Sequence, residues 1–310
     1  MSVPAAFGGV ILIWATTPLA IKWSSEGGHF LFGVSARMLL GLFLCLVLVA
    51  LLSRRMRWYP AALSTYVAGG LGVWGAMTSV YWGAQYVPSG LISVIFGFSP
   101  VVTGLFAHLW LQERAFTAFR SLGMVLGVAG LAVIFRNSLV LGVDALYGVA
   151  AVLVSVLIHS ASVVAVKRIN AGVPALQVTT GSLMVALPLF LLVWAVADGQ
   201  WPRELPTRAW MAIVYLGVVG SVVGFVLYFY ILRALPATRV ALLALVSPVL
   251  ALFIGWAFNG EVIPWETWAG TALILSALAV YQWGDRLWGM GLGAPAGPRL
   301  GAPEGARAKD

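Results

Sequence analysis

Ten long apolar runs, separated by short polar segments, dominate the pattern along the chain. They cover roughly residues 3–23, 30–52, 62–84, 90–111, 117–135, 145–166, 176–196, 209–231, 239–258 and 266–284. Each holds about 20 mainly apolar residues, the length that an α-helix needs to span a hydrocarbon core of ~30 Å. The segments between them carry the glycines, prolines and charges typical of turns. The pattern predicts an all-α polytopic membrane protein with ten transmembrane helices.

One motif within these runs occurs twice. Its paired positions, each 148 residues apart, are Pro88 and Pro236, Ser99 and Ser247, Pro100 and Pro248, Val101 and Val249, and Glu113 and Glu261. A period near half of the chain indicates an internal duplication, with one five-helix repeat over 3–136 and another over 145–284. Since five is an odd number, the second repeat crosses the membrane in the opposite direction. Two inverted five-helix repeats are typical of secondary transporters, which bind their substrate between the repeats.

The composition agrees with a membrane protein and indicates its orientation. The chain is 61% hydrophobic and 9% charged, with a mean hydropathy of +0.98, too little polar surface for a soluble protein of 310 residues. Its net charge of +8 is spread over the loops, so we do not expect nucleic acid as a partner. Lys and Arg number 13 on one set of alternate loops and 4 on the other. The positive-inside rule then places both termini in the cytoplasm, with 289–310 as a disordered tail.

Two prolines lie near the centres of their apolar runs. Pro100 and Pro248 have no N–H to donate, which frees the carbonyl oxygens of Phe96 and Ala244. A freed carbonyl is costly in lipid, so such helices tend to line a cavity. We expect Ser99 and Ser247 to face that cavity, and the prolines to act as hinges. The alternative is an ordinary proline kink, which is common in membrane helices.

These motifs resemble the EamA repeat of the drug/metabolite transporter superfamily. The resemblance rests on a proline, Ser-Pro-Val eleven residues later and a terminal glutamate, together with Arg37 early in the second run, and it spans about residues 3–284. It implies ten helices, a central cavity lined by the third, fourth, eighth and ninth, and export of small metabolites across a bacterial inner membrane. The aromatic content looks most like that of the YddG-type aromatic amino-acid exporters. No arginine opens the seventh helix as Arg37 opens the second.

The third run carries a polar and aromatic stripe. Trp74, Thr78, Tyr81 and Gln85 are spaced by 4, 3 and 4 residues, so they share one helix face. Aromatic rings stack on an aromatic substrate, and an amide can bond its head group. We therefore expect this face to bind substrate. For Gln85, near the helix end, an interfacial position is an equal alternative.

Further candidates for substrate binding lie on other runs: Trp14 and Thr17 in the first, His159 and Ser162 beside Ser155 in the sixth, and Ser221, Phe225 and Tyr228 in the eighth. His159 could contact a substrate carboxylate, relay a proton, or bond neutrally between helices. Arg37 could bind a carboxylate, but we favour a structural role, in which it bonds freed carbonyls. Gly123 and Gly127 indicate tight packing, either within the bundle or between protomers.

The expected function is secondary transport of aromatic or hydrophobic amino acids by alternating access. The alternatives are a broader drug or metabolite exporter and, less favoured, a polytopic membrane enzyme. An enzyme would need clustered His, Asp or Glu, whereas the three histidines lie far apart in sequence and no carboxylate falls in a helix centre. We expect no enzymatic activity, cofactor or metal. The expected partners are a small-molecule substrate and the lipid bilayer, and the sequence leaves the oligomeric state open, with a monomer favoured.

Overall fold

A computed structural model describes residues 2–27, 30–52, 55–112, 117–141, 143–197, 199–202, 204–224, 227, 231 and 243–291 of the chain. Within these residues the protein contains helices and turns and no strand. Four residues singled out in the sequence, Glu113, Phe225, Tyr228 and Pro236, lie outside the described part.

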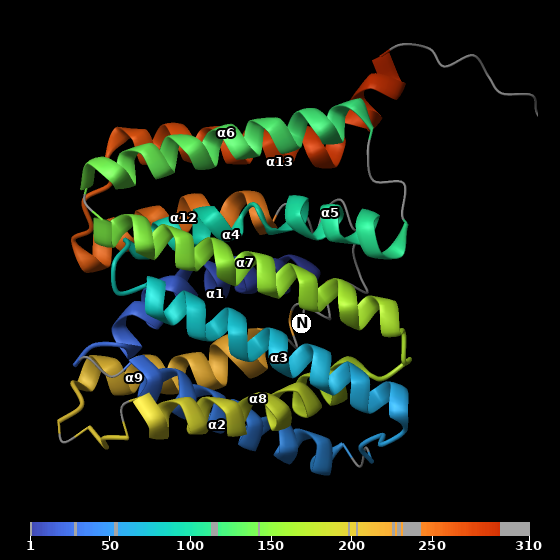
Figure 1. The fold of residues 1–310 in the computed structure, drawn as a ribbon, viewed down its shortest axis with the longest axis vertical. Helices are drawn as coiled ribbons and strands as arrows, with labels where there is room; N and C mark the ends of the chain where they lie inside the picture. The colour runs from blue at the N-terminus through green and yellow to red at the C-terminus, as the bar shows by residue number, and fades with distance from the viewer. Residues whose placement is uncertain are drawn as a thin grey trace, which may run out of the picture.

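The helices follow one another along the chain as Figure 1 shows. In order they are α1 (Val3–Ser24), α2 (Phe30–Leu51), α3 (Pro60–Gly83), α4 (Ser89–Phe96), α5 (Ser99–Leu111), α6 (Ala118–Leu141), α7 (Val143–Ile169), α8 (Ala175–Ala197), α9 (Thr207–Tyr215), the π-helix η1 (Leu216–Val223), α12 (Leu243–Asn259) and α13 (Trp265–Gly291).

Each of the ten apolar runs corresponds to a helix or to an interrupted helix, which confirms an all-α polytopic membrane protein built as two inverted five-helix repeats. Five spans among the described residues are long and apolar enough to cross a bilayer, and one of them joins α4 and α5 across residues 89–111. Two runs are not single α-helices: 90–111 is divided between α4 and α5, and 209–231 passes from α9 into η1. Helix α13 extends to Gly291, so residues 289–291 are helical, and 292–310 lie outside the described part.

The outer surface of the bundle is apolar. Large side chains such as Phe43, Val125 and Val196 are 60%, 66% and 80% exposed. Buried polar residues such as Ser155 and Thr180 lie between helices instead. This distribution suits a protein whose surrounding solvent is lipid, where hydrogen-bonding groups must be satisfied inside the bundle.

The contacts between the two halves are related by an approximate two-fold exchange of helices. α1 packs on α12, and its counterpart α7 packs on α4 and α5. The third segment of the second half, α9 with η1, is the counterpart of α3: α9 packs on α1, and α3 packs on α7. In the same way, α2 contacts α9 and η1, and α8 contacts α3. Three pairs, α2 with α8, α4 with α12 and α6 with α13, are their own counterparts. In Figure 1, α6 and α13 lie side by side at one end of the bundle and α2 and α8 at the other.

Glycines allow these helices to approach closely. A Cβ atom at Gly123 would lie 2.8 Å from the carbonyl oxygen of Ala277, and one at Gly130 would lie 2.9 Å from that of Gly270. Gly127 packs in the same way against the ring of Phe98. The glycines of α6 therefore serve packing within the bundle, the first of the two alternatives.

We predict that Gly130→Ala destabilises the protein by about 1–3 kcal/mol, because the added methyl group would meet backbone atoms of α13 that cannot move independently. Thermal unfolding of the detergent-solubilised protein measures this. Gly8→Ala is the matched control, since no atom of the described residues outside its own stretch of helix lies within 4 Å of its Cβ position. Equal unfolding temperatures for the two variants would contradict close packing of α6 on α13.

Candidate functional site

The fourth transmembrane segment is interrupted at Gly97 and Phe98. α4 ends at Phe96, and Pro100 lies in the first turn of α5, where its missing N–H needs no helical partner. Pro100 therefore lies at the start of a new helix, and the fourth segment is a broken helix rather than one with an ordinary proline kink. The two halves also differ here, because Pro248 lies inside α12, which is continuous over Leu243–Asn259.

Helix α7 lies against this interruption. The Ser160 hydroxyl donates to the carbonyl oxygen of Ser99 at 3.4 Å, and the ring of His159 lies 6.4 Å from that of Phe96, centroid to centroid. The structure thus brings two predicted site residues, Ser99 and His159, to the same break. Ser99 is half-buried, and the His159 side chain is exposed.

The predicted stripe on α3 is largely enclosed and incompletely hydrogen-bonded. Tyr81 is fully buried, and its hydroxyl accepts a hydrogen bond from Nη1 of Arg37 at 3.4 Å. Trp74 Nε1 and Thr78 Oγ1 are buried and have no hydrogen-bond partner among the described residues. Buried polar atoms are paired in the great majority of cases, so these two call for an explanation. A ligand that reaches them is a natural one.

Two more predicted residues share this property. Ser247 is 4% exposed, and its hydroxyl has no partner in the described part of the chain. Arg37 is 8% exposed, and its Nε is likewise unpaired there. Unpaired groups of this kind are costly inside a membrane.

Helices α1, α2 and η1 converge beside Arg37. A Cβ atom at Gly220 would lie 3.8 Å from Nη2 of Arg37 and 4.0 Å from Oγ1 of Thr17. The Thr17 hydroxyl donates to the carbonyl oxygen of Ile13 at 2.6 Å, and that of Ser221 to Leu216 at 2.9 Å. π-Helical turns are uncommon and occur frequently at functional sites.

The remaining predicted residues lie outside this group. Ser162 and Ser155 donate to the α3 carbonyl oxygens of Ala68 and Ala76, at 3.0 and 2.7 Å, and so join α7 to α3. Gln85 is exposed and donates to the carbonyl oxygen of Trp82 at 3.2 Å, which agrees with the interfacial alternative. Trp14 is 37% exposed on α1.

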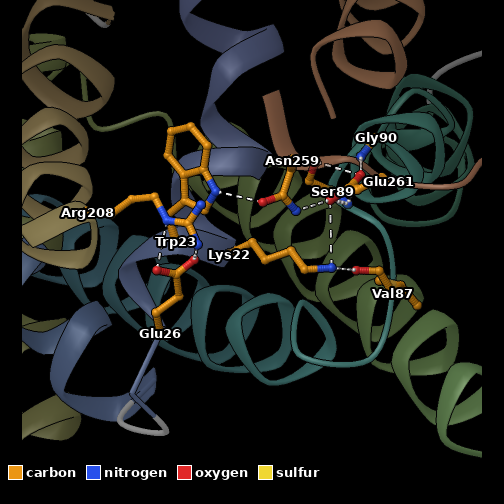
Figure 2. A network of polar contacts seen from close by, with 9 residues as sticks. All are labelled: Lys22, Trp23, Glu26, Val87, Ser89, Gly90, Arg208, Asn259 and Glu261. Atoms are coloured by element: carbon orange, nitrogen blue, oxygen red, sulfur yellow. Dashed lines mark hydrogen bonds and ion pairs between the residues drawn. The ribbon is translucent and has the colours of Figure 1, made fainter. Parts of the chain in front are cut away.

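Sequence reasoning missed a buried carboxylate at the far end of α4. Glu261, 8% exposed, follows α12 and lies at the first turn of α4 (Figure 2). Both of its oxygens accept from the backbone N–H of Ser89 at 2.9 Å, and Oε2 also accepts from the Ser89 hydroxyl at 3.0 Å. Pro88, the residue before α4, has no side chain that can cap the helix. Glu261, from the other repeat, supplies the cap and the negative charge that a helix N-terminus favours.

A polar network spreads from this cap across helix ends (Figure 2). Lys22 Nζ lies 3.7 Å from Glu261 Oε1 and donates to the Val87 carbonyl oxygen at 3.0 Å. Asn259 donates to Glu261 at 3.0 Å and accepts from the indole N–H of Trp23 at 2.9 Å. The repeat itself held the signal, because Glu261 is one of its paired positions, but the motif does not say which helix end the carboxylate contacts.

The network continues to α9. The guanidinium of Arg208 lies 5.3 Å from the Trp23 ring centroid and pairs with the carboxylate of Glu26, to which Nε donates at 2.9 Å. It therefore connects α1, α4, α9 and the segment after α12. No group of three His, Cys, Asp or Glu side chains arranged to hold a metal occurs among the residues that the structure describes.

An inverted-repeat helical bundle with unpaired polar groups near an interrupted helix has the architecture of a membrane transporter. The EamA-like transporter family matches the chain over residues 4–136 and 146–282, and the protein belongs to this family.

Named relatives and a solved structure agree with this assignment. The transporter YoaV of Bacillus subtilis (strain 168) is 26% identical over 271 residues, which are 86% of this chain and 91% of the relative. A probable terminal-alkyne amino-acid exporter of Streptantibioticus cattleyicolor is 29% identical over 273 residues, covering 84% and 90%. A crystal structure with 21% sequence identity superposes with a TM-score of 0.64 over 93% of this chain and 98% of the other, which shows the shared fold.

We predict that Glu261→Gln destabilises the protein by about 3 kcal/mol, because the variant leaves Lys22 without its counter-charge and turns an amide N–H₂ toward the N–H of Ser89. Chemical denaturation in detergent measures the effect. Glu204→Gln, at an exposed carboxylate before α9, is the matched control. A Glu261→Gln protein as stable as the control would show that the cap adds nothing to the fold.

Proposed function

We propose that this transporter exports aromatic or hydrophobic amino acids through a central cavity between its inverted repeats, by alternating access. The observation that carries the proposal is the pair of buried, unpaired polar atoms on α3, Trp74 Nε1 and Thr78 Oγ1. Both lie on the α3 face that also carries Tyr81, whose hydroxyl contacts Arg37 of α2. The relative named as a probable amino-acid exporter supports this substrate class.

The chemistry of the α3 face suits an aromatic zwitterion. The indole of Trp74 offers a ring to stack on and an N–H to donate, and the Thr78 hydroxyl both donates and accepts. Because these groups have no partner among the described residues, binding a polar substrate would satisfy them without breaking existing hydrogen bonds. Ser247, from the ninth transmembrane segment, adds a hydroxyl that has no partner in the described part of the chain.

Transport is proposed to follow the substrate gradient or an ion gradient. The carboxylates of Glu26, Asp144, Glu204, Glu261 and Glu266 lie in loops or at helix ends, which disfavours coupling through a buried acid in a helix centre. His159, beside the break between α4 and α5, is the one described group near mid-helix that could carry a proton.

The network around Glu261 is proposed to close the outer side of the protein. With both termini in the cytoplasm of a bacterial cell, as the charge on alternate loops predicts, the ends of α1 and α12 and the start of α4 face outward. Opening that side would separate Glu261 from Ser89 and Lys22. Gly97 and Phe98 between α4 and α5 provide a place to bend, with Pro100 holding the start of α5.

A broader drug or metabolite exporter is the second candidate. The same apolar enclosure would admit many hydrophobic compounds, and most of the relatives found are named only as transporters.

We predict that purified protein in proteoliposomes transports tryptophan in preference to threonine and to a cationic dye. The α3 face offers an aromatic ring for stacking, together with hydrogen-bonding groups for the head group of a zwitterion. Trp74→Ala should raise the KM for tryptophan about tenfold, the size of effect that loss of one good stacking and hydrogen-bonding partner produces. Trp82→Ala, on the same helix but exposed, is the control and should leave the KM unchanged. Transport of the dye with no transport of tryptophan would favour the broader exporter.

We predict that replacing Pro100 and Pro248 together by alanine lowers flux at least tenfold while membrane insertion stays normal, because alanine restores helical N–H groups at both positions and stiffens the segments. Initial rates at equal amounts of inserted protein measure the effect. Pro188→Ala, at a proline inside α8 but outside the repeated motif, serves as the control. Wild-type rates for the double variant would rule out the prolines as hinges.

A further inference from the structure

Arg37 is a buried cation within a transmembrane helix. It lies seven residues into α2, about 10 Å along the helix axis from Phe30, and is 8% exposed. A guanidinium does not lose its proton in proteins, so the charge remains. Charged groups at such depth are expensive, and they almost always face the bundle interior and mark a functional pathway.

Few described groups compensate this charge. The one hydrogen bond recorded for Arg37 among them runs to the Tyr81 hydroxyl at 3.4 Å, longer than the usual 2.7–3.2 Å range of N–H···O bonds. Nε has no partner in the same set. The two ion pairs recorded there join Lys22 to Glu261 and Arg208 to Glu26. The structural role that the sequence favoured, bonding freed carbonyl oxygens, finds no contact in the described part of the chain.

Small and polar residues of other helices lie beside the guanidinium of Arg37. Gly220 of the π-helix η1 presents no side chain there, and the Thr17 hydroxyl lies on the other side of the Gly220 position. Tyr81 approaches from α3. The unpaired Thr78 hydroxyl follows one turn along α3, about 4.5 Å away on the helix axis, and Trp74 one turn beyond.

We propose that the Arg37 guanidinium binds the carboxylate of the transported substrate. The planar fork of an arginine matches a carboxylate in a two-bond arrangement, and such charge-assisted hydrogen bonds are the stronger kind. The carboxylate supplies a counter-charge that no described residue gives Arg37, while Trp74 and Thr78 hold the rest of the molecule. The inference rests on the proposed function and adds to it that the substrate must be a carboxylate.

The test compares ligands that differ only in this group. Purified full-length protein in detergent is heated with tryptophan, tryptophan amide, tryptamine or indole-3-propionate, and counterflow of the same compounds is measured in proteoliposomes. Tryptophan is expected to stabilise the protein at concentrations at least tenfold lower than the amide or tryptamine, and to be transported at least tenfold faster. The reason is that a site built to bond a carboxylate rejects analogues that lack it. Equal effects of tryptophan and its amide would overturn the inference, and this measurement needs no variant.

Variants then assign the discrimination to Arg37. Arg37→Gln should raise the KM for tryptophan more than tenfold and bring tryptophan and its amide to equal rates, with Arg37→Lys intermediate because the charge remains without the fork. Arg136→Gln, at an exposed arginine of α6, should keep the wild-type preference. An Arg37→Gln protein that still prefers tryptophan over the amide would refute the assignment, and so would one whose rates for both compounds fall by the same factor. If Arg37→Gln does not fold, Arg37→Lys serves as the test, and an unchanged preference in that variant refutes the assignment.

Failure of the two proposals can be told apart. If indole-3-propionate binds in an Arg37-dependent manner while tryptophan and other amino acids do not, the carboxylate site stands and amino-acid export falls. If tryptophan and its amide are transported alike, amino-acid export stands and the role of Arg37 falls.

Discussion

The free ends of an interrupted helix must be satisfied by protein when no water is at hand, and much of this structure follows from that requirement. α4 begins without a capping side chain of its own and ends at Phe96, before Pro100 can continue the helix. Glu261 from the second repeat caps its start, and α7 bonds the start of α5 through Ser160 and Ser99. The start of α4, far from the break, and the start of α5, beside it, are thus each bonded by a residue of the other repeat. This couples the two halves by hydrogen bonds that cannot be made within either one.

The halves share a motif but not a conformation. The first repeat divides its fourth segment at Gly97 and Phe98, while α12 runs through Pro248 without interruption. Conversely, α3 is a continuous α-helix, whereas its counterpart passes from α9 into the π-helix η1. Two similar sequences that adopt different local conformations are what alternating access by exchange of roles requires, and the difference supports the proposed mechanism without depending on any particular substrate.

The charged side chains differ in depth and in whether they form ion pairs. The recorded ion pairs of the described residues lie at helix ends, where Glu261 and Glu26 compensate Lys22 and Arg208 and hold neighbouring helices together. Arg37 lies deeper, on the same side as hydroxyl and indole groups that have no partner in the described part of the chain, and its one hydrogen bond there is the long contact to Tyr81. The paired charges join neighbouring helices, and Arg37, which has no ion pair among the described residues, is the charge that we propose to bind a ligand, since charged groups at such depth are costly and mark functional pathways.

The sequence by itself determined the class and the architecture. Hydropathy is a property of consecutive residues, and the 148-residue repeat is visible in paired positions such as Pro100 and Pro248, so ten helices in inverted repeats follow without knowledge of any contact. The tertiary structure decided which side chains are available. Ser162 and Trp74 are equal candidates by helical spacing, yet the Ser162 hydroxyl bonds the α3 backbone, whereas the Trp74 N–H has no partner among the residues that the structure describes. Likewise, the sequence identifies Glu261 only as a repeated position, and the tertiary structure places its carboxylate at the first turn of α4. Spacing fixes the face of a helix, but the partner on that face comes from segments far away in the chain, and only packing brings them together.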